Sequence, residues 1–183
     1  MPPGEQPKGL SYYERPDGVT VALWKDNMAA LSPDGGKTWT PIGRHPFPES
    51  SAKIWGQRTG DGRYALVYDH SATERNRFPL VVVTSDDGHD FDHLLAIHGE
   101  VPPLRYQGMH KPAGPQYVRG ITPGNGNPPG DHMWVTYSMN KEDIWVTRVR
   151  VPVIGEVGEA VREDFESAET GADLALWNLY IPQ

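Results

Sequence analysis

The chain has 183 residues, a formal net charge of −7, 20 glycines, 18 prolines and no cysteine. The missing cysteines exclude disulfides and thiolate metal sites, and an acidic chain without a basic stripe is not expected to bind nucleic acid. A charged fraction of 22% and a hydrophobic fraction of 37% exclude both outright disorder and a membrane span.

Short runs of β-branched and aromatic residues, separated by Gly, Pro, Asp and Asn, predict strands along most of the chain. In chain order the expected strands are Val19–Trp24, Ala29–Ser32, Trp39–Ile42, Ile54–Gln57, Tyr64–Tyr68, Leu80–Ser85, His93–His98, Gln116–Ile121, Met133–Ser138 and Ile144–Val151. The segments "HPFPES" and "TPGNGNPPGD" between them are typical of loops.

The strand order repeats in units of roughly 40–50 residues with four strands each, which is typical of propeller blades. One unit is "IWGQRT", "RYALVYD", "PLVVVTS" and "HLLAIHG", and the next begins at "PQYVRGI". We therefore expect an all-β fold, with about three four-stranded antiparallel blades over 1–153. The acidic segment 154–183 is expected to be a linker and the start of another element.

A turn motif precedes the last strand of two units. In "SPDGGKTWT" the order S-x-D-x-G-x-T-W is filled by Ser32, Asp34, Gly36, Thr38 and Trp39. A degenerate copy, "TSDDGHDF", fills these slots with Thr84, Asp86, Gly88, Asp90 and Phe91. The Asp side chain of each copy is expected to accept hydrogen bonds from nearby backbone N–H groups and so to fix a hairpin. A calcium loop is the alternative, but each copy has too few carboxylates and no closing Glu.

These two turns, about one blade apart, resemble the Asp-box of sialidases and other bacterial-neuraminidase repeat proteins. The resemblance implies a sialidase-like β-propeller with six or seven blades in its complete ring. Because an open ring exposes sheet edges, we expect a fragment, a missing N-terminal half, or self-association that closes the ring. The segment 154–183 resembles the opening of a β-sandwich appended to such propellers.

The same resemblance implies a carbohydrate-active, exo-glycosidase-type protein that acts on or binds a terminal sugar, either acidic or neutral. Two alternatives stay open at this point. One is a histidine-dependent hydrolase or lyase of rhamnose–glucuronate linkages, and the other is a non-catalytic glycan-binding module. In each case the expected partner is a glycan or oligosaccharide.

Polar residues at strand starts and ends supply the candidate site. Amides suit sugar hydroxyls, arginines suit a sugar carboxylate, and aromatic rings suit a sugar face. The expected substrate-binding residues are Gln57, Arg58, Arg105, Gln116, Arg119, Asn140 and Lys141. The expected catalytic residues are His110, as a general base, with Tyr117, Glu142 and Asp143. Structural roles are the alternative: ion pairs for the arginines, core packing for Tyr117, and a solvated hairpin for "NKED".

No H-x-x-H, H-E-x-x-H or G-x-S-x-G spacing occurs, so we expect neither a metal ion nor a cofactor nor a serine nucleophile. The N-terminus "MPPGEQPKGL" lacks the basic and apolar regions of a signal peptide. The chain is therefore either cytoplasmic or, if secreted or periplasmic, targeted by a segment outside this sequence.

Overall fold

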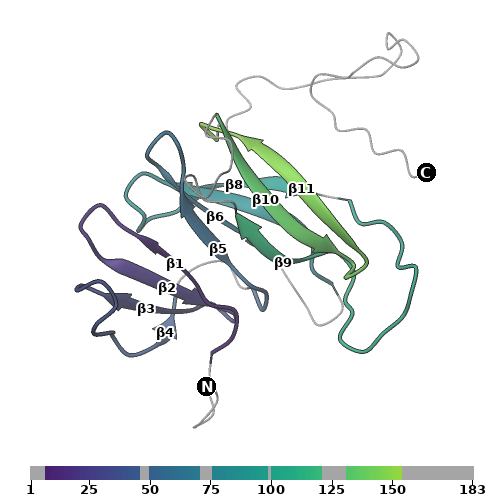
Figure 1. Cartoon of the computed structure of the whole chain (residues 1–183), viewed down its shortest axis with the longest axis horizontal. Coiled ribbons are helices and arrows are strands. Elements are labelled where there is room, and N and C mark those ends of the chain that lie inside the picture. Colours follow the sequence, from purple (N-terminus) through teal and green to yellow (C-terminus); the bar gives the residue numbers. More distant parts are fainter. Residues whose placement is uncertain (1–6, 46–49, 71–75, 99, 121–130, 154–183) are drawn as a thin grey trace.

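The structure, a computed structural model, describes residues 7–45, 50–70, 76–98, 100–120 and 131–153 (Figure 1). Within these residues the regular elements are strands, arranged in three antiparallel sheets that follow one another along the chain. The linker and further element expected over 154–183 lie outside the described residues.

Each sheet is a meander of consecutive strands. The first contains β1 (Ser11–Glu14), β2 (Thr20–Trp24), β3 (Met28–Ser32) and β4 (Gly43–Arg44). The second contains β5 (Trp55–Arg58), β6 (Tyr64–Asp69), β7 (Leu80–Ser85) and β8 (Asp92–His98). The third contains β9 (Pro115–Gly120), β10 (His132–Met139) and β11 (Asp143–Arg150).

Two expected elements differ from the observed ones. Strand β1 was not predicted, because its four residues form too short a run to stand out between two turn segments. The strand expected over Trp39–Ile42 is wrong, and β4 follows it at Gly43–Arg44. Pro41 has no N–H to donate, so the ladder with β3 is limited there to the bond from Thr40 N to the Leu31 carbonyl, at 2.9 Å.

The three sheets lie side by side as blades, with their first strands adjacent (Figure 1). β1 contacts β5, and β5 contacts β9. The side chains of β6 and β7 are buried along their whole length, because the second sheet is covered on both faces. Alternate residues divide between two cores: Ala65 and Val67 pack toward the third sheet, and Leu66 and Tyr68 toward the first.

The contact between the second and third sheets is closest at their inner strands. A Cβ atom on Gly120 would lie 2.0 Å from Oε1 of Gln57 and 2.1 Å from Nε1 of Trp55. Trp55 Nε1 donates to Gln57 Oε1 at 3.0 Å, and both groups occupy the space that glycine leaves open. The absence of a side chain at Gly120 is therefore required for β9 to approach β5.

The first Asp-box folds as a hydrogen-bonded turn between β3 and β4. Oδ1 of Asp34 accepts from the Ser32 hydroxyl and from Thr38 N, both at 2.8 Å. These bonds, first of all the one from the Thr38 backbone, lower the pKa of Asp34 to about 2. Trp39 remains 44% exposed and donates from Nε1 to the Gly36 carbonyl at 3.0 Å, so its ring closes the turn and is not wedged between sheets.

The second box has a register one residue later than expected. Its Ser–Asp pair is Ser85 and Asp87, joined at 2.9 Å, and Asp87 accepts from the backbone of His89 and Asp90. The Gly88 N–H donates to the Ser85 hydroxyl at 2.8 Å. Thr84 and Asp86, expected in these roles, belong instead to β7 and to an ion pair with Arg63 at 2.6 Å. Phe91 packs partly buried against the core shared with the first sheet.

Candidate functional site

A cavity of about 270 Å³ collects charged side chains at one end of the blades. Lys25 follows β2, Asp69 ends β6, and Lys53 precedes β5, so turns from consecutive blades meet there. We call it the cationic cavity. Its wall consists of Lys25, Ala52, Lys53, Asp69, Arg77, His110, Pro112, Gln116, Tyr117 and Lys141.

Asp69 is the acidic residue of this cavity. It ends the fully buried strand β6 and is itself only 2% exposed. Among the described residues, its Oδ1 has no hydrogen-bond partner. Burial raises the pKa of Asp69 from 3.8 to about 8, although the Arg77 charge opposes the shift. The carboxyl is therefore protonated at neutral pH, as a general acid must be.

The cations of the cavity face few acids. Within the described ranges, Lys25, Lys53 and Arg77 form no ion pair. Burial, and secondarily the Arg119 charge, lowers the pKa of Lys53 to about 8, because a buried ammonium is poorly solvated. With Asp69 neutral, the described wall of the cavity is positive in a protein whose formal net charge is −7. Such a site favours an anionic ligand.

Tyr117 is placed at this cavity by a bulge in β9. The register between β9 and β10 shifts, since Thr136 pairs with Arg119 and Ser138 with Gln116. Tyr117 has a φ of 57°, a left-handed conformation that a bulky side chain rarely adopts. Tyr117 is 60% exposed, and Lys141 Nζ lies 5.4 Å from the centroid of its ring. Bulges commonly re-aim a side chain beside a functional site.

The structure divides the residues expected from sequence among three places. His110, Gln116, Tyr117 and Lys141 line the cationic cavity. Gln57, Arg58 and Arg119 line a wider hollow of about 970 Å³ along β1 and β5. There, Arg119 lies 5.4 Å from the Trp55 ring, and Arg58 Nε donates to the Gly62 carbonyl at 3.3 Å.

The remaining four predicted residues line neither space. Arg105 donates from Nε to Glu142 at 3.2 Å and from Nη2 to Asp143 at 2.9 Å. The hydrogen bond from Lys111, together with those from the Tyr106 and Arg105 backbone, lowers the pKa of Glu142 to about 2. Asn140 is 1% exposed and bonded to the backbone. These contacts fix the loop over 102–114 to the turn between β10 and β11.

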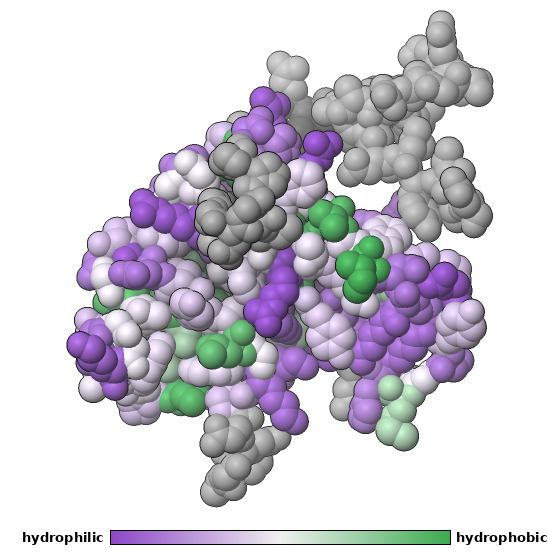
Figure 2. Space-filling view, viewed as in Figure 1, coloured by the Kyte–Doolittle hydropathy of each residue, from purple (hydrophilic) through white to green (hydrophobic). Residues whose placement is uncertain are grey.

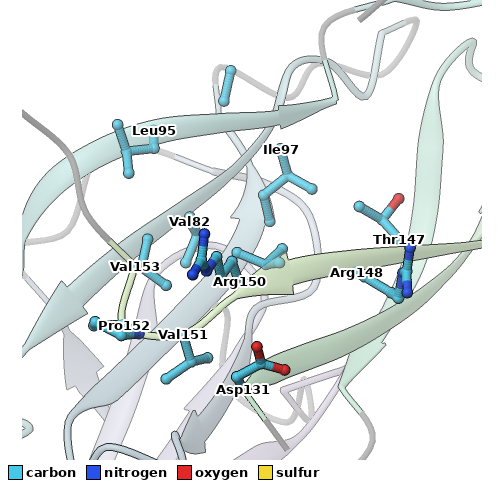
Figure 3. A pocket seen from close by; sticks show the side chains of 12 residues that line it. Val82, Leu95, Ile97, Asp131, Thr147, Arg148, Arg150, Val151, Pro152 and Val153 are labelled. Atoms are coloured by element: carbon cyan, nitrogen blue, oxygen red, sulfur yellow. The ribbon is translucent and has the colours of Figure 1, made fainter. Parts of the chain in front are cut away.

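A third hollow, of about 650 Å³, separates β8 from the end of the third sheet (Figure 3). Leu95 and Ile97 lie on one side, and Val151 and Val153 on the other. Aliphatic side chains dominate this wall, so it continues the packing between blades. The outer surface seen in Figure 2 is largely hydrophilic, with small hydrophobic patches.

One acidic group in the described residues has the spacing of metal ligands: Asp87, His89 and Asp90, all exposed. Asp87 already accepts the backbone N–H groups of His89 and Asp90, at 2.8 and 3.0 Å. The arrangement is explained by the turn of the second Asp-box.

Sequence reasoning missed the charged centre of the site. Asp69, Lys53, Arg77 and Lys25 were not among the expected residues. Asp69 did carry a signal, since it ends the apolar run "YALVY", where an ionised carboxylate would be costly to bury. The lysines and Arg77 come from separate loops, and their convergence depends on how the blades pack.

Comparison with known proteins agrees with this architecture. The BNR repeat-like domain family matches residues 11–148. A solved structure titled "Sialidase" is 47% identical, with a TM-score of 0.74, over 81% of this chain and 14% of that chain. A search of curated proteins found no match.

These findings confirm the all-β, partial sialidase-like propeller expected from the sequence. The chain spans 14% of the length of the solved sialidase that it matches. Within the described part of the chain, no helix has the length and apolar character needed to cross a membrane.

Proposed function

Because the chain belongs to the BNR repeat-like family and gathers cations around a buried carboxyl, we propose that it binds a terminal acidic sugar and hydrolyses its glycosidic bond. The reaction site is the cationic cavity. The observation that carries the proposal is Asp69, a neutral acid beside Arg77 and Lys53.

The cavity supplies the parts that glycoside hydrolysis needs. Arg77, Lys53 and Lys25 hold the anionic group of the sugar through charge-assisted bonds. Asp69 donates its proton to the glycosidic oxygen as the bond to the anomeric carbon breaks. His110 accepts a proton from the water that attacks that carbon. In the covalent version of the scheme, the Tyr117 oxygen attacks the anomeric carbon and its proton passes to His110. In a second step the Asp69 carboxylate takes a proton from water, which attacks the same carbon, and the tyrosine leaves with the proton held by His110.

The anion also keeps the acid in its working form. A bound negative charge close to Asp69 opposes ionisation of the carboxyl, so the proton remains available until the leaving oxygen develops charge. An acidic substrate therefore contributes to catalysis as well as to binding. A neutral sugar of the same shape would lack both effects.

The test compares nitrophenyl glycosides of acidic and neutral sugars. We expect release of nitrophenol from an acidic glycoside by the wild-type chain, and loss of turnover with retained binding in Asp69→Asn. Asp17→Asn is the matched control, because Asp17 is a surface carboxylate bonded to Arg15 and to the Val19 backbone. Cleavage of neutral and acidic glycosides at equal rates would refute the assignment of the cavity to an anion.

The position of His110 favours a second candidate, a histidine-dependent cleavage of a uronate linkage. His110 lines the cationic cavity, and its carbonyl accepts from Lys141 Nζ. In that case His110→Ala abolishes turnover, whereas Asp69→Asn leaves most of it. Binding of acidic sugars without cleavage of any glycoside would identify the chain as a glycan-binding module.

A further inference from the structure

We infer that Glu142 is a positioning residue: its carboxylate fixes the loop over 102–114 to the β10–β11 turn and so places His110 at the cationic cavity. The functional meaning of this placement rests on the function proposed above. The sequence had suggested Glu142 as a catalytic residue, and its contacts argue for this different role.

The carboxylate of Glu142 is fully occupied by the loop. Oε1 accepts from the backbone N–H of Arg105 at 3.0 Å and of Tyr106 at 2.9 Å, and also from Lys111 Nζ. Oε2 accepts from the Nε of Arg105 at 3.2 Å. The Glu142 side chain is 4% exposed, because these partners cover it. A carboxylate whose acceptor positions are all filled by protein donors cannot at the same time exchange a proton with a substrate.

The neighbouring residues of the turn hold the rest of the loop. Asn140 donates from Nδ2 to the Pro102 carbonyl at 2.8 Å and accepts from Gly114 N at 2.7 Å, which ties the two ends of the loop together. Lys141 Nζ donates to the His110 carbonyl, at the segment that reaches the cavity. Glu142 accepts hydrogen bonds from Arg105 and Tyr106, between these two ends of the loop. Three consecutive turn residues thus fix the loop at its ends, middle and cavity-facing segment.

The geometry of the turn makes this arrangement possible. Asn140 and Lys141 have φ values of 57° and 56°, and Glu142 N bonds to the Met139 carbonyl at 2.9 Å. The two positive φ values are those of a type I′ turn, and three residues, 140–142, separate the paired Met139 and Asp143. The turn is tight and follows the twist of the two strands. It carries the side chains of Asn140, Lys141 and Glu142 toward the loop from a rigid hairpin. The position of the loop is therefore set by β10 and β11.

The experiment compares the wild-type chain with Glu142→Gln, Glu142→Ala and the remote control Asp17→Asn. Hydrogen exchange is measured at the Arg105 and Tyr106 amides, and the His110 ring is followed by its NMR signals. Affinity for glucuronate, with glucose as the neutral control, is measured on the same samples. Glu142→Gln keeps the shape of the side chain, so it remains informative if Glu142→Ala fails to fold.

We expect both amides to exchange at least about tenfold faster in Glu142→Ala, which removes their acceptor, and faster than wild type by a smaller factor in Glu142→Gln, which leaves a neutral acceptor in place of a charged one. The His110 ring signals should shift and the glucuronate affinity should fall, while Asp17→Asn behaves as wild type. Unchanged amide protection would overturn the proposal, as would a released loop that leaves the His110 signals in place. If the wild-type chain binds no glucuronate and cleaves no acidic glycoside, the proposed function fails, and amide exchange and the His110 signals still decide the role of Glu142.

Discussion

Replacing Asp69 by Asn should stabilise the folded chain at neutral pH. In the folded state the carboxyl has a pKa of about 8, raised by burial from 3.8. Keeping it protonated at pH 7 costs about 1.36 kcal/mol for each of the roughly three pH units above 3.8, or about 4 kcal/mol in all. Asn has nearly the same shape and no proton to gain, so it avoids this cost.

The sign of the pH dependence follows from the two pKa values. The pKa of Asp69 is 3.8 in the unfolded chain and about 8 in the folded chain. Between these two values the folded state holds a proton that the unfolded chain releases. The contribution of Asp69 to stability therefore decreases as pH rises through this window. The Asn variant lacks this slope, so its advantage over wild type should grow by about 4 kcal/mol from about pH 5 to about pH 8.

Urea unfolding followed by tryptophan fluorescence at several pH values measures this difference directly. Asp17→Asn serves as the control, because Asp17 is exposed and its pKa is lowered by the hydrogen bond from Arg15. Its effect should stay constant above pH 5, a value well above any point where it titrates. A stability difference for Asp69→Asn that does not change with pH would show that Asp69 ionises normally, and the general-acid assignment would fall with it.

Three further outcomes are expected. Gly120→Ala should destabilise the chain by roughly 1–3 kcal/mol in urea unfolding, since its Cβ would overlap Gln57, whereas Gly43→Ala, in open space, should be neutral. Asp34→Ala should lower the melting temperature at pH 7 but not near pH 2. The pKa of Asp34 is lowered from 3.8 to about 2 in the folded chain. The stability that ionised Asp34 contributes is therefore present above pH 3.8 and lost as pH falls through about 2. Arg77→Gln should weaken binding of an acidic sugar about tenfold by calorimetry and leave a neutral sugar unaffected; equal loss for both sugars would contradict an anion-specific role.

Strands, blades and turns were predicted from local patterns, and most of them were confirmed. The runs "YALVYD" and "LVVVTS" became strands β6 and β7, because continuous apolar runs require burial on both faces. The first Asp-box formed its turn because Asp34 and its donors lie within a few residues of one another. The second box was displaced by one residue, since Ser85 and Asp87 match the required spacing as well as Thr84 and Asp86.

The sequence by itself determined the class of fold, because side-chain alternation and turn chemistry act over a few residues. Only the tertiary structure decided the site. Lys53, Asp69 and Arg77 meet because β5, β6 and the following loop bring separate segments to one end of the blades. The pKa of Asp69 depends on burial, and burial is set by neighbouring sheets that the segment around Asp69 does not encode. Glu142 was visible in the sequence as an acid, but its donors Arg105 and Lys111 come from a distant loop, and those long-range bonds set its role.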